Sequence, residues 1–128
     1  MEAFEIKEIF NVPPSQLYRA WLDSDLHAKM TGGGASCSNE EGGSFSVWDG
    51  YITGTNVELI KNKKIVQHWR TSEFSKTDED SVLILKIKEV SDGTELTLIH
   101  KNIPQGQTQY EKGWVDHYFT PMKAYFSK

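Results

Sequence analysis

Histidine is the residue of this sequence that would most readily supply acid–base catalysis or a metal site. The four histidines are His27, His68, His100 and His117. None has a second histidine at the three- or four-residue spacing with which one helix face binds a metal, and no cysteine or carboxylate cluster has the spacing of a zinc site. We therefore expect no metal and no cofactor.

The other reactive side chains also lack partners. Cys37 lies in a Gly/Ser-rich stretch without a nearby histidine to activate it. Ser44 and its neighbours lack the Gly-x-Ser-x-Gly context of a hydrolase. Glu40 and Glu41 precede two glycines, which fits a solvated turn better than an acid–base pair. These patterns indicate no catalytic residues.

The aromatic residues point instead to binding. The sequence contains four Trp, five Tyr and six Phe, and large rings either fill a core or line an apolar chamber. Alternation places His100 beside Leu96 and Leu98, facing the core or a pocket, and a hydrogen-bonded core histidine is favoured over a catalytic one. Simple packing of a helix on a sheet is the alternative to a chamber. The candidate lining residues are Phe45, Val47, Trp69, Leu85, Leu98, His100, Trp114, Tyr118 and Met122.

Length and charge restrict the class of protein. The 128 residues fit a single domain, 1–128, with one core. The net charge of −4 is unfavourable for binding nucleic acid. Residues 1–10 are too charged for a signal peptide, Cys37 has no cysteine to pair with, and no stretch is long and apolar enough to cross a membrane. We expect a cytoplasmic protein that binds neither nucleic acid nor membrane.

Hydrophobic periodicity predicts the elements that position these residues. Residues 4–12 alternate as a half-buried strand. From Ser15 the apolar spacing changes to four, which predicts two short helices, the second capped by Ser24 or Asp25. The glycines 32–34 then form a flexible connector. Further strands are expected around 45–47, which leads into a two-residue hairpin turn at Asp49-Gly50, and over 51–60, 64–71, 82–90 and 95–102.

A final helix is predicted from about Thr108, because Trp114, Tyr118 and Met122 recur at steps of four. Its apolar stripe must lie on the sheet. Pro121 removes the hydrogen bond to the carbonyl of His117 and predicts a bend. The result is an α+β helix-grip layout, with a curved six- to seven-stranded antiparallel sheet, two short helices after the first strand and a long C-terminal helix across the sheet. A lipocalin-like barrel would leave the early helices without a role.

Several stretches, in order, resemble the C-terminal domain of the activators of the heat-shock protein 90 (Hsp90) ATPase. They are FEIKEIFNVPPSQLYRAWLD, GGSFSVWDG, KIVQHWR, GTELTLIHKNIP and GWVDHYFTPMK, and the similarity runs over residues 4–126. The resemblance implies a START-like (SRPBCC) fold and, in eukaryotic members, association with Hsp90. Those activators also have an N-terminal domain that grips the chaperone, for which 128 residues leave no room.

The resemblance implies a non-catalytic binding domain, chaperone-associated or stress-related, whose partner is an Hsp90 homologue. A carrier or sensor that holds a small hydrophobic ligand between the sheet and the last helix is the alternative. An enzyme similar to the START-like polyketide cyclases is less favoured. Only His100, Tyr118 and Gln67 would offer that enzyme polar groups inside the chamber.

Overall fold

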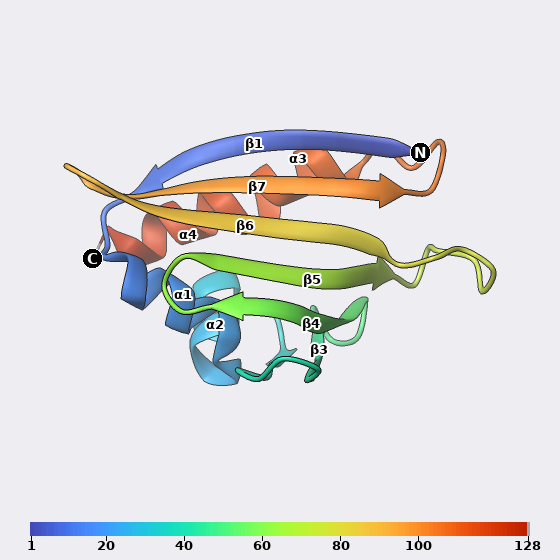
Figure 1. Ribbon diagram of the computed structural model, residues 1–128, viewed down its shortest axis with the longest axis horizontal. Coiled ribbons are helices and arrows are strands. Elements are labelled where there is room, and N and C mark those ends of the chain that lie inside the picture. The colour runs from blue at the N-terminus through green and yellow to red at the C-terminus, as the bar shows by residue number, and fades with distance from the viewer. Residues whose placement is uncertain (128) are drawn as a thin grey trace.

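The computed structural model describes residues 1–127, which form one antiparallel sheet with helices against one of its faces (Figure 1). The seven strands lie in the order β1-β7-β6-β5-β4-β3-β2. They are β1 (Glu2–Phe10), β2 (Ala35–Ser36), β3 (Ser44–Val47), β4 (Ile52–Ile60), β5 (Lys64–Thr71), β6 (Ser81–Val90) and β7 (Gly93–Ile103). The helical elements are α1 (Pro14–Leu22), α2 (Ser24–Thr31), α3 (Tyr110–Trp114), the π-helical turn η1 (Val115–Phe119) and α4 (Thr120–Phe126). The predicted helix-grip architecture is confirmed.

The core lies between the sheet and the C-terminal helix. Residues of one parity in β6 and β7 face this helix, and the register pairs Leu83 with His100 and Leu85 with Leu98. All four side chains are completely buried. The predicted alternation therefore identifies the inner face of the sheet correctly.

Asp23 separates the two short helices and caps the second of them. Its carboxylate oxygen Oδ1 accepts a hydrogen bond from the backbone N–H of Leu26 at 2.9 Å, which satisfies a donor at the start of α2. The prediction of Ser24 or Asp25 as the cap was wrong, because α1 and α2 share this one residue as C-cap and N-cap. Gly32 ends α2 with a φ of +86°, a conformation that glycine adopts without strain.

Two of the glycines after α2, Gly33 and Gly34, lie in close contact with the loop that follows β3. A Cβ on Gly33 would lie 2.5 Å from the indole of Trp48, and one on Gly34 would lie 2.2 Å from a carboxylate oxygen of Asp49. These contacts leave no room for a side chain. The description of residues 32–34 as a flexible connector therefore missed the function of Gly33 and Gly34, which is to let the loop after β3 approach the backbone.

The C-terminal helix begins at Tyr110 and crosses the sheet behind β7 and β6 in the view of Figure 1. It continues through η1 into α4, and the backbone N–H of Thr120 bonds to the carbonyl of Val115 in the wider π-helical pattern. This turn directly precedes Pro121, whose ring would clash with a carbonyl four residues earlier in a regular α-helix. The chain thus accommodates Pro121 by widening the helix. No helix within residues 1–127 is long and apolar enough to cross a membrane.

Candidate functional site

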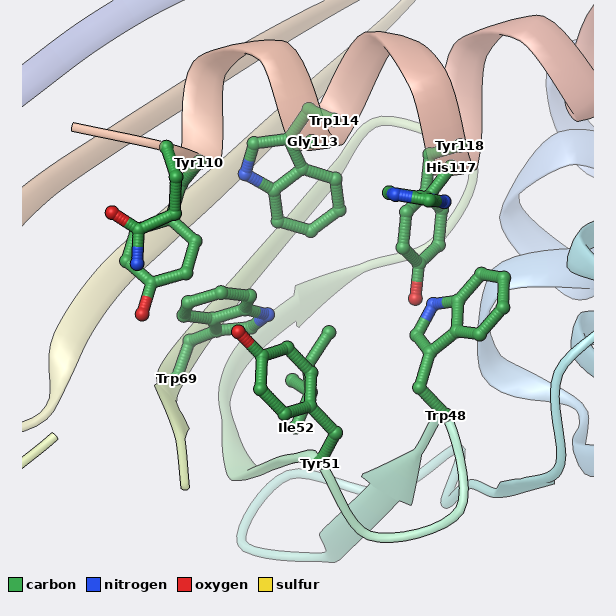
Figure 2. A pocket seen from close by; sticks show the side chains of 10 residues that line it. Trp48, Tyr51, Ile52, Trp69, Tyr110, Gly113, Trp114, His117 and Tyr118 are labelled. Carbon is green, nitrogen blue, oxygen red and sulfur yellow. The ribbon is translucent and has the colours of Figure 1, made fainter. Parts of the chain in front are cut away.

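An open pocket of about 550 Å³ lies between the C-terminal helix, β5 and the loop that joins β3 to β4 (Figure 2). Most of its wall is aromatic. The aromatic residues that line it are Trp48, Tyr51, Trp69, Tyr110, Trp114 and Tyr118. The remaining lining residues are Ile52, Gln109, Gly113 and His117.

The helix supplies its part of the wall from one stripe. Tyr110, Trp114 and Tyr118 follow one another at four-residue steps, so their rings lie on the same face. The Trp114 and Tyr118 rings are 4.7 Å apart between centroids, and the Trp114 and Trp69 rings 5.6 Å. Gly113 keeps the space beside them open, because a Cβ at this position would meet no atom within 4 Å.

The opposite wall is a four-residue loop instead of the predicted two-residue turn. Val47 and Ile52 form the last pair of β3 and β4, and Trp48, Asp49 and Gly50 between them all have positive φ, of 54°, 56° and 92°. A positive φ is unusual for a side chain as large as that of Trp48. The loop is held by a 3.2 Å hydrogen bond from the Asp49 N–H to the Gly34 carbonyl, so Trp48 is fixed in the pocket wall.

A buried histidine supports the pocket from behind. The Nδ1 atom of His27 lies 2.9 Å from the carbonyl oxygen of Trp21, and Nε2 lies 2.9 Å from the Tyr118 hydroxyl. Because a carbonyl only accepts, Nδ1 carries the proton and the Tyr118 hydroxyl donates to Nε2. Burial lowers the pKa of His27 and raises the pKa of Tyr118. Both groups are therefore neutral, and the hydrogen bond between them positions the Tyr118 ring.

A second buried histidine joins the helix to the sheet. The indole N–H of Trp114 donates to Nδ1 of His100 at 3.0 Å. The other ring nitrogen, Nε2, therefore carries the proton and donates to the Ser81 hydroxyl at 2.8 Å, which donates in turn to the carbonyl of Trp69 at 2.6 Å. Burial lowers the pKa of His100 from 6.5 to about 3. The Ser81–His100 pair is fully buried and has all its protons engaged, so it has the geometry of a structural pair.

A closed ring of hydrogen bonds lies beside the mouth of the pocket, which the exposed ring of Tyr51 and the neighbouring Tyr110 mark. The Glu73 N–H donates to Thr71 Oγ1 at 3.1 Å, and the Thr71 hydroxyl bonds to the Tyr110 hydroxyl at 2.7 Å. The Tyr110 hydroxyl donates to Gln107 Oε1 at 2.7 Å. Gln107 Nε2 closes the ring by donating to the Glu73 carbonyl at 3.1 Å. The Glu73 carboxylate accepts a hydrogen bond from the Tyr51 hydroxyl. Burial raises the pKa of Tyr51 and of Tyr110, and the Glu73 charge raises both further.

The predicted lining residues fall into three groups. Trp69, Trp114 and Tyr118 line the pocket. Phe45 and Val47 lie behind them, at an internal space of only about 10 Å³. Leu85, Leu98, His100 and Met122 are completely buried and do not line the pocket. Their strand and helix faces were predicted correctly, but the helix packs directly on this part of the sheet, so the space opens only toward β4 and the 48–51 loop.

Sequence reasoning missed the other seven lining residues, which are Trp48, Tyr51, Ile52, Gln109, Tyr110, Gly113 and His117. The periodicity of the helix contained a signal for Tyr110, which is four residues before Trp114. For the loop, the signal was that two aromatic residues, Trp48 and Tyr51, flank Asp49-Gly50. Of the polar groups considered for an enzyme, only Tyr118 lines the pocket. Gln67 is buried and bonds to Asn56 at 2.9 Å, and His100 is buried in the core.

The pocket is suited to binding by aromatic contact. None of its lining residues is Lys, Arg, Asp, Glu or Cys. No group of three or more metal-ligating side chains occurs in the part of the chain that the structure describes. Every buried side-chain nitrogen or oxygen within residues 1–127 has a hydrogen-bond partner. The polar groups around the pocket thus hold its walls in place.

Comparison with curated proteins identifies relatives that are much longer than this chain. It is 30% identical over 127 residues to an activator of 90 kDa heat shock protein ATPase homolog from Dictyostelium discoideum, covering 98% of this chain and 33% of that protein. It is 28% identical over 122 residues to the human activator of 90 kDa heat shock protein ATPase homolog 1, covering 94% and 36%. The chain therefore spans about a third of the length of these relatives.

Solved structures share the fold over nearly the whole chain. A crystal structure of an HSP90 activator from Plasmodium falciparum has a TM-score of 0.90 and 27% identity, covering 99% of this chain and 97% of that one. The Aha1 dimer from Colwellia psychrerythraea, solved in solution, has a TM-score of 0.82 at 14% identity, covering 98% and 96%, and shows the fold alone. The family model for activator of Hsp90 ATPase homolog 1-like proteins matches residues 11–127. This chain belongs to that family.

Proposed function

We propose that this protein binds an Hsp90-type chaperone in the cytoplasm and acts by association, without catalysis. The observation that carries the proposal is the similarity to the Plasmodium falciparum HSP90 activator, which covers 99% of this chain and 97% of the solved chain. A domain of this length therefore occurs in a protein described as such an activator. The free, half-buried thiol of Cys37 is compatible with the reducing cytoplasm.

The state of the buried histidines supports the non-catalytic part of the proposal. His27 and His100 each use both ring nitrogens in hydrogen bonds inside the core. A general base needs a free nitrogen within reach of its substrate. Neither residue offers one.

The sheet face that the helices leave uncovered is the surface we propose for the chaperone. Val66, Ile84 and Ile99 are direct neighbours across β5, β6 and β7 and form a half-buried apolar row on this face. Lys64 and Lys86 lie directly opposite each other in the adjacent row. Lys64 forms an ion pair with Glu58 at 3.0 Å, whereas Lys86 forms none within residues 1–127. The positive charge of Lys86 is therefore available to an anionic partner surface, next to the apolar row.

An amide-resolved NMR titration of the labelled protein with Hsp90 from the same organism tests this function. We expect localised shifts or line broadening in β5, β6 and β7. Lys86→Glu reverses one charge on the proposed surface, whereas Lys29→Glu makes the same reversal on α2. We expect only the first variant to weaken binding. An unchanged spectrum at saturating chaperone would refute association, and equal effects of both variants would refute the surface.

The pocket favours a second candidate function, a carrier or sensor of a small hydrophobic ligand. Its volume of about 550 Å³ lies within the range of small-molecule sites, and its wall is mostly aromatic. This function is compatible with chaperone binding, because the pocket and the outer sheet face use opposite sides of β5.

A variant that fills the pocket tests the second candidate without disturbing the core. Gly113 is helical and a Cβ there meets nothing within 4 Å, so Gly113→Leu should occupy the space while the helix gains a better helix former. We expect a neutral fluorescent probe such as Nile red to bind the native protein and to lose its affinity for Gly113→Leu. Gly113→Ala is the matched small substitution and should retain most of the binding. Equal binding by all three proteins would contradict the proposal.

A further inference from the structure

The aromatic pocket has a carboxylate without an ion-pair partner beside its lining residue Tyr51 and no lysine or arginine in its wall. Glu73 bonds to Tyr51 of the lining. No lysine, arginine or histidine of residues 1–127 forms an ion pair with Glu73. We propose that the pocket takes a small organic cation with an alkylated ammonium group. This inference rests on the second candidate function, ligand binding in the pocket.

The wall has the chemistry that such a cation requires. The faces of indole and phenol rings carry negative charge density and attract an ammonium group, with tryptophan the strongest. Three of the six aromatic lining residues are tryptophans, namely Trp48, Trp69 and Trp114. Neighbouring rings are tilted, by 40° between Trp69 and Trp114 and by 49° between Trp114 and Tyr118. The rings therefore form a curved wall instead of one stack, as Figure 2 shows.

The backbone of Glu73 is held beside the pocket residue Tyr110. The N–H and the carbonyl of Glu73 both belong to the hydrogen-bonded ring with Thr71, Tyr110 and Gln107. The carboxylate itself accepts a hydrogen bond from the Tyr51 hydroxyl, which places its negative charge beside the pocket wall. This charge raises the pKa of Tyr51 and of Tyr110, in addition to the larger effect of burial.

The opposite wall is preformed at the expense of backbone strain. Trp48 has a φ of 54° in the left-handed region, which a residue with so large a side chain adopts where its surroundings hold it. The Trp48 ring lies against Gly33 and forms a T-shaped pair with the His117 ring, with 5.7 Å between the ring centroids. An indole fixed in this way needs no ordering when a ligand enters.

The test compares a cation with its neutral isostere. Choline and 3,3-dimethylbutan-1-ol have the same shape, but only choline carries a charge. We expect choline to quench the tryptophan fluorescence of the native protein, to shift the indole N–H signals of Trp48 and Trp69, and to bind about tenfold more tightly than the alcohol. Benzyltrimethylammonium, which fills more of the 550 Å³, should bind more tightly than choline.

Two charge-neutralising variants in the same segment locate the charge that attracts the cation. Glu73→Gln keeps the backbone ring of hydrogen bonds and should weaken choline binding about threefold, with little change for the alcohol. Glu79→Gln removes one charge from an exposed position between β5 and β6 and should change neither affinity. Higher salt should weaken choline binding more than alcohol binding.

Different failures overturn different statements. If the alcohol binds as tightly as choline, or if Glu73→Gln weakens both ligands equally, the cation inference is wrong although the pocket still binds apolar ligands. If neither ligand nor a neutral probe binds, and Gly113→Leu changes nothing, both the inference and the second candidate function are wrong. If choline binds equally well to Gly113→Leu, it binds elsewhere and the assignment to this pocket is wrong.

Discussion

The indole N–H of Trp114 donates a hydrogen bond to Nδ1 of His100 at 3.0 Å, which joins the C-terminal helix to the centre of the sheet. The indole can only donate, so the histidine must accept and its other nitrogen must carry the proton. A second proton on His100 would face this N–H directly. The contact between helix and sheet therefore requires His100 to be neutral.

Acidification should destabilise the protein through His100. Its pKa is lowered from 6.5 to about 3 in the fold, so below pH 6.5 the unfolded chain binds a proton that the native protein excludes. The free energy of unfolding should fall as the pH decreases from about 6.5 toward 3, by about 1.4 kcal/mol per pH unit and by about 2 kcal/mol at pH 5. His27, whose pKa is also lowered, adds to the loss. Urea unfolding at pH 7.5, 6 and 5 measures it.

A variant separates the effect of His100 from that of other groups. His100→Gln should be less stable than the native protein at pH 7.5, but its stability should depend less on pH between 7.5 and 5. A histidine ring signal of His100 that titrates with a midpoint near 6.5 in NMR would contradict this account, as would an unchanged pH dependence in the variant.

Tyr118→Phe should reduce stability without changing the shape of the pocket. The Tyr118 hydroxyl is the hydrogen-bond donor to Nε2 of His27 at 2.9 Å, and its removal leaves a buried acceptor without a partner. We expect a loss of about 1–3 kcal/mol in the free energy of unfolding, measured with denaturant at pH 7.5. Tyr125→Phe, on the same helix, is the control. Equal losses in the two variants would show that the hydroxyl bond is not the cause.

The fold was predictable because local patterns and long-range structure agree. Alternation in residues 82–90 and 95–102 identified the buried face of β6 and β7, and the four-residue spacing of Trp114, Tyr118 and Met122 identified the helix that covers it. Asp23 was missed as a cap because three polar residues stand in sequence there, and only the backbone geometry selects among them.

The pocket was only partly predictable, because periodicity identifies a face but not the places where that face is left uncovered. His100 and Trp69 share the inner face of the sheet, yet only Trp69 lines the pocket. The left-handed conformation of Trp48 could not be inferred, since aspartate and glycine in the next two positions are typical of a shorter turn. Glu73 lies beside the pocket through hydrogen bonds with Tyr51 and Gln107, which are far from it in sequence.

Gly54→Ala should strongly destabilise the sheet. Gly54 pairs with Phe45 and with Trp69, and a Cβ there would lie 1.9 Å from the carbonyl oxygen of His68 and 2.6 Å from the Phe45 ring. Because one of these atoms belongs to the backbone, the strand itself must move. We expect a loss of roughly 2–4 kcal/mol in the free energy of unfolding. Gly113→Ala, in open space on α3, should instead be neutral or stabilising by up to about 1 kcal/mol.

Gly33→Ala should change the pocket more than it changes stability. A Cβ at Gly33 would lie 2.5 Å from the Trp48 indole, so the ring must move, and Trp48 lines the pocket. We expect at least about a fivefold loss of affinity for a neutral probe, since displacing one anchor of an aromatic site costs about 1 kcal/mol or more. Probe titration followed by tryptophan fluorescence measures the change.

Gly32→Ala provides the matched control for this last prediction. Gly32 has a φ of +86° and no atom within 4 Å of a Cβ position, so alanine there should cost about 1 kcal/mol of stability through backbone strain alone. It should leave the Trp48 ring and the probe affinity unchanged. Both variants replace a glycine by alanine, at adjacent positions. A loss of affinity in Gly33→Ala alone would therefore assign the effect to the contact with Trp48. Equal affinities would show that the indole wall does not contribute to binding.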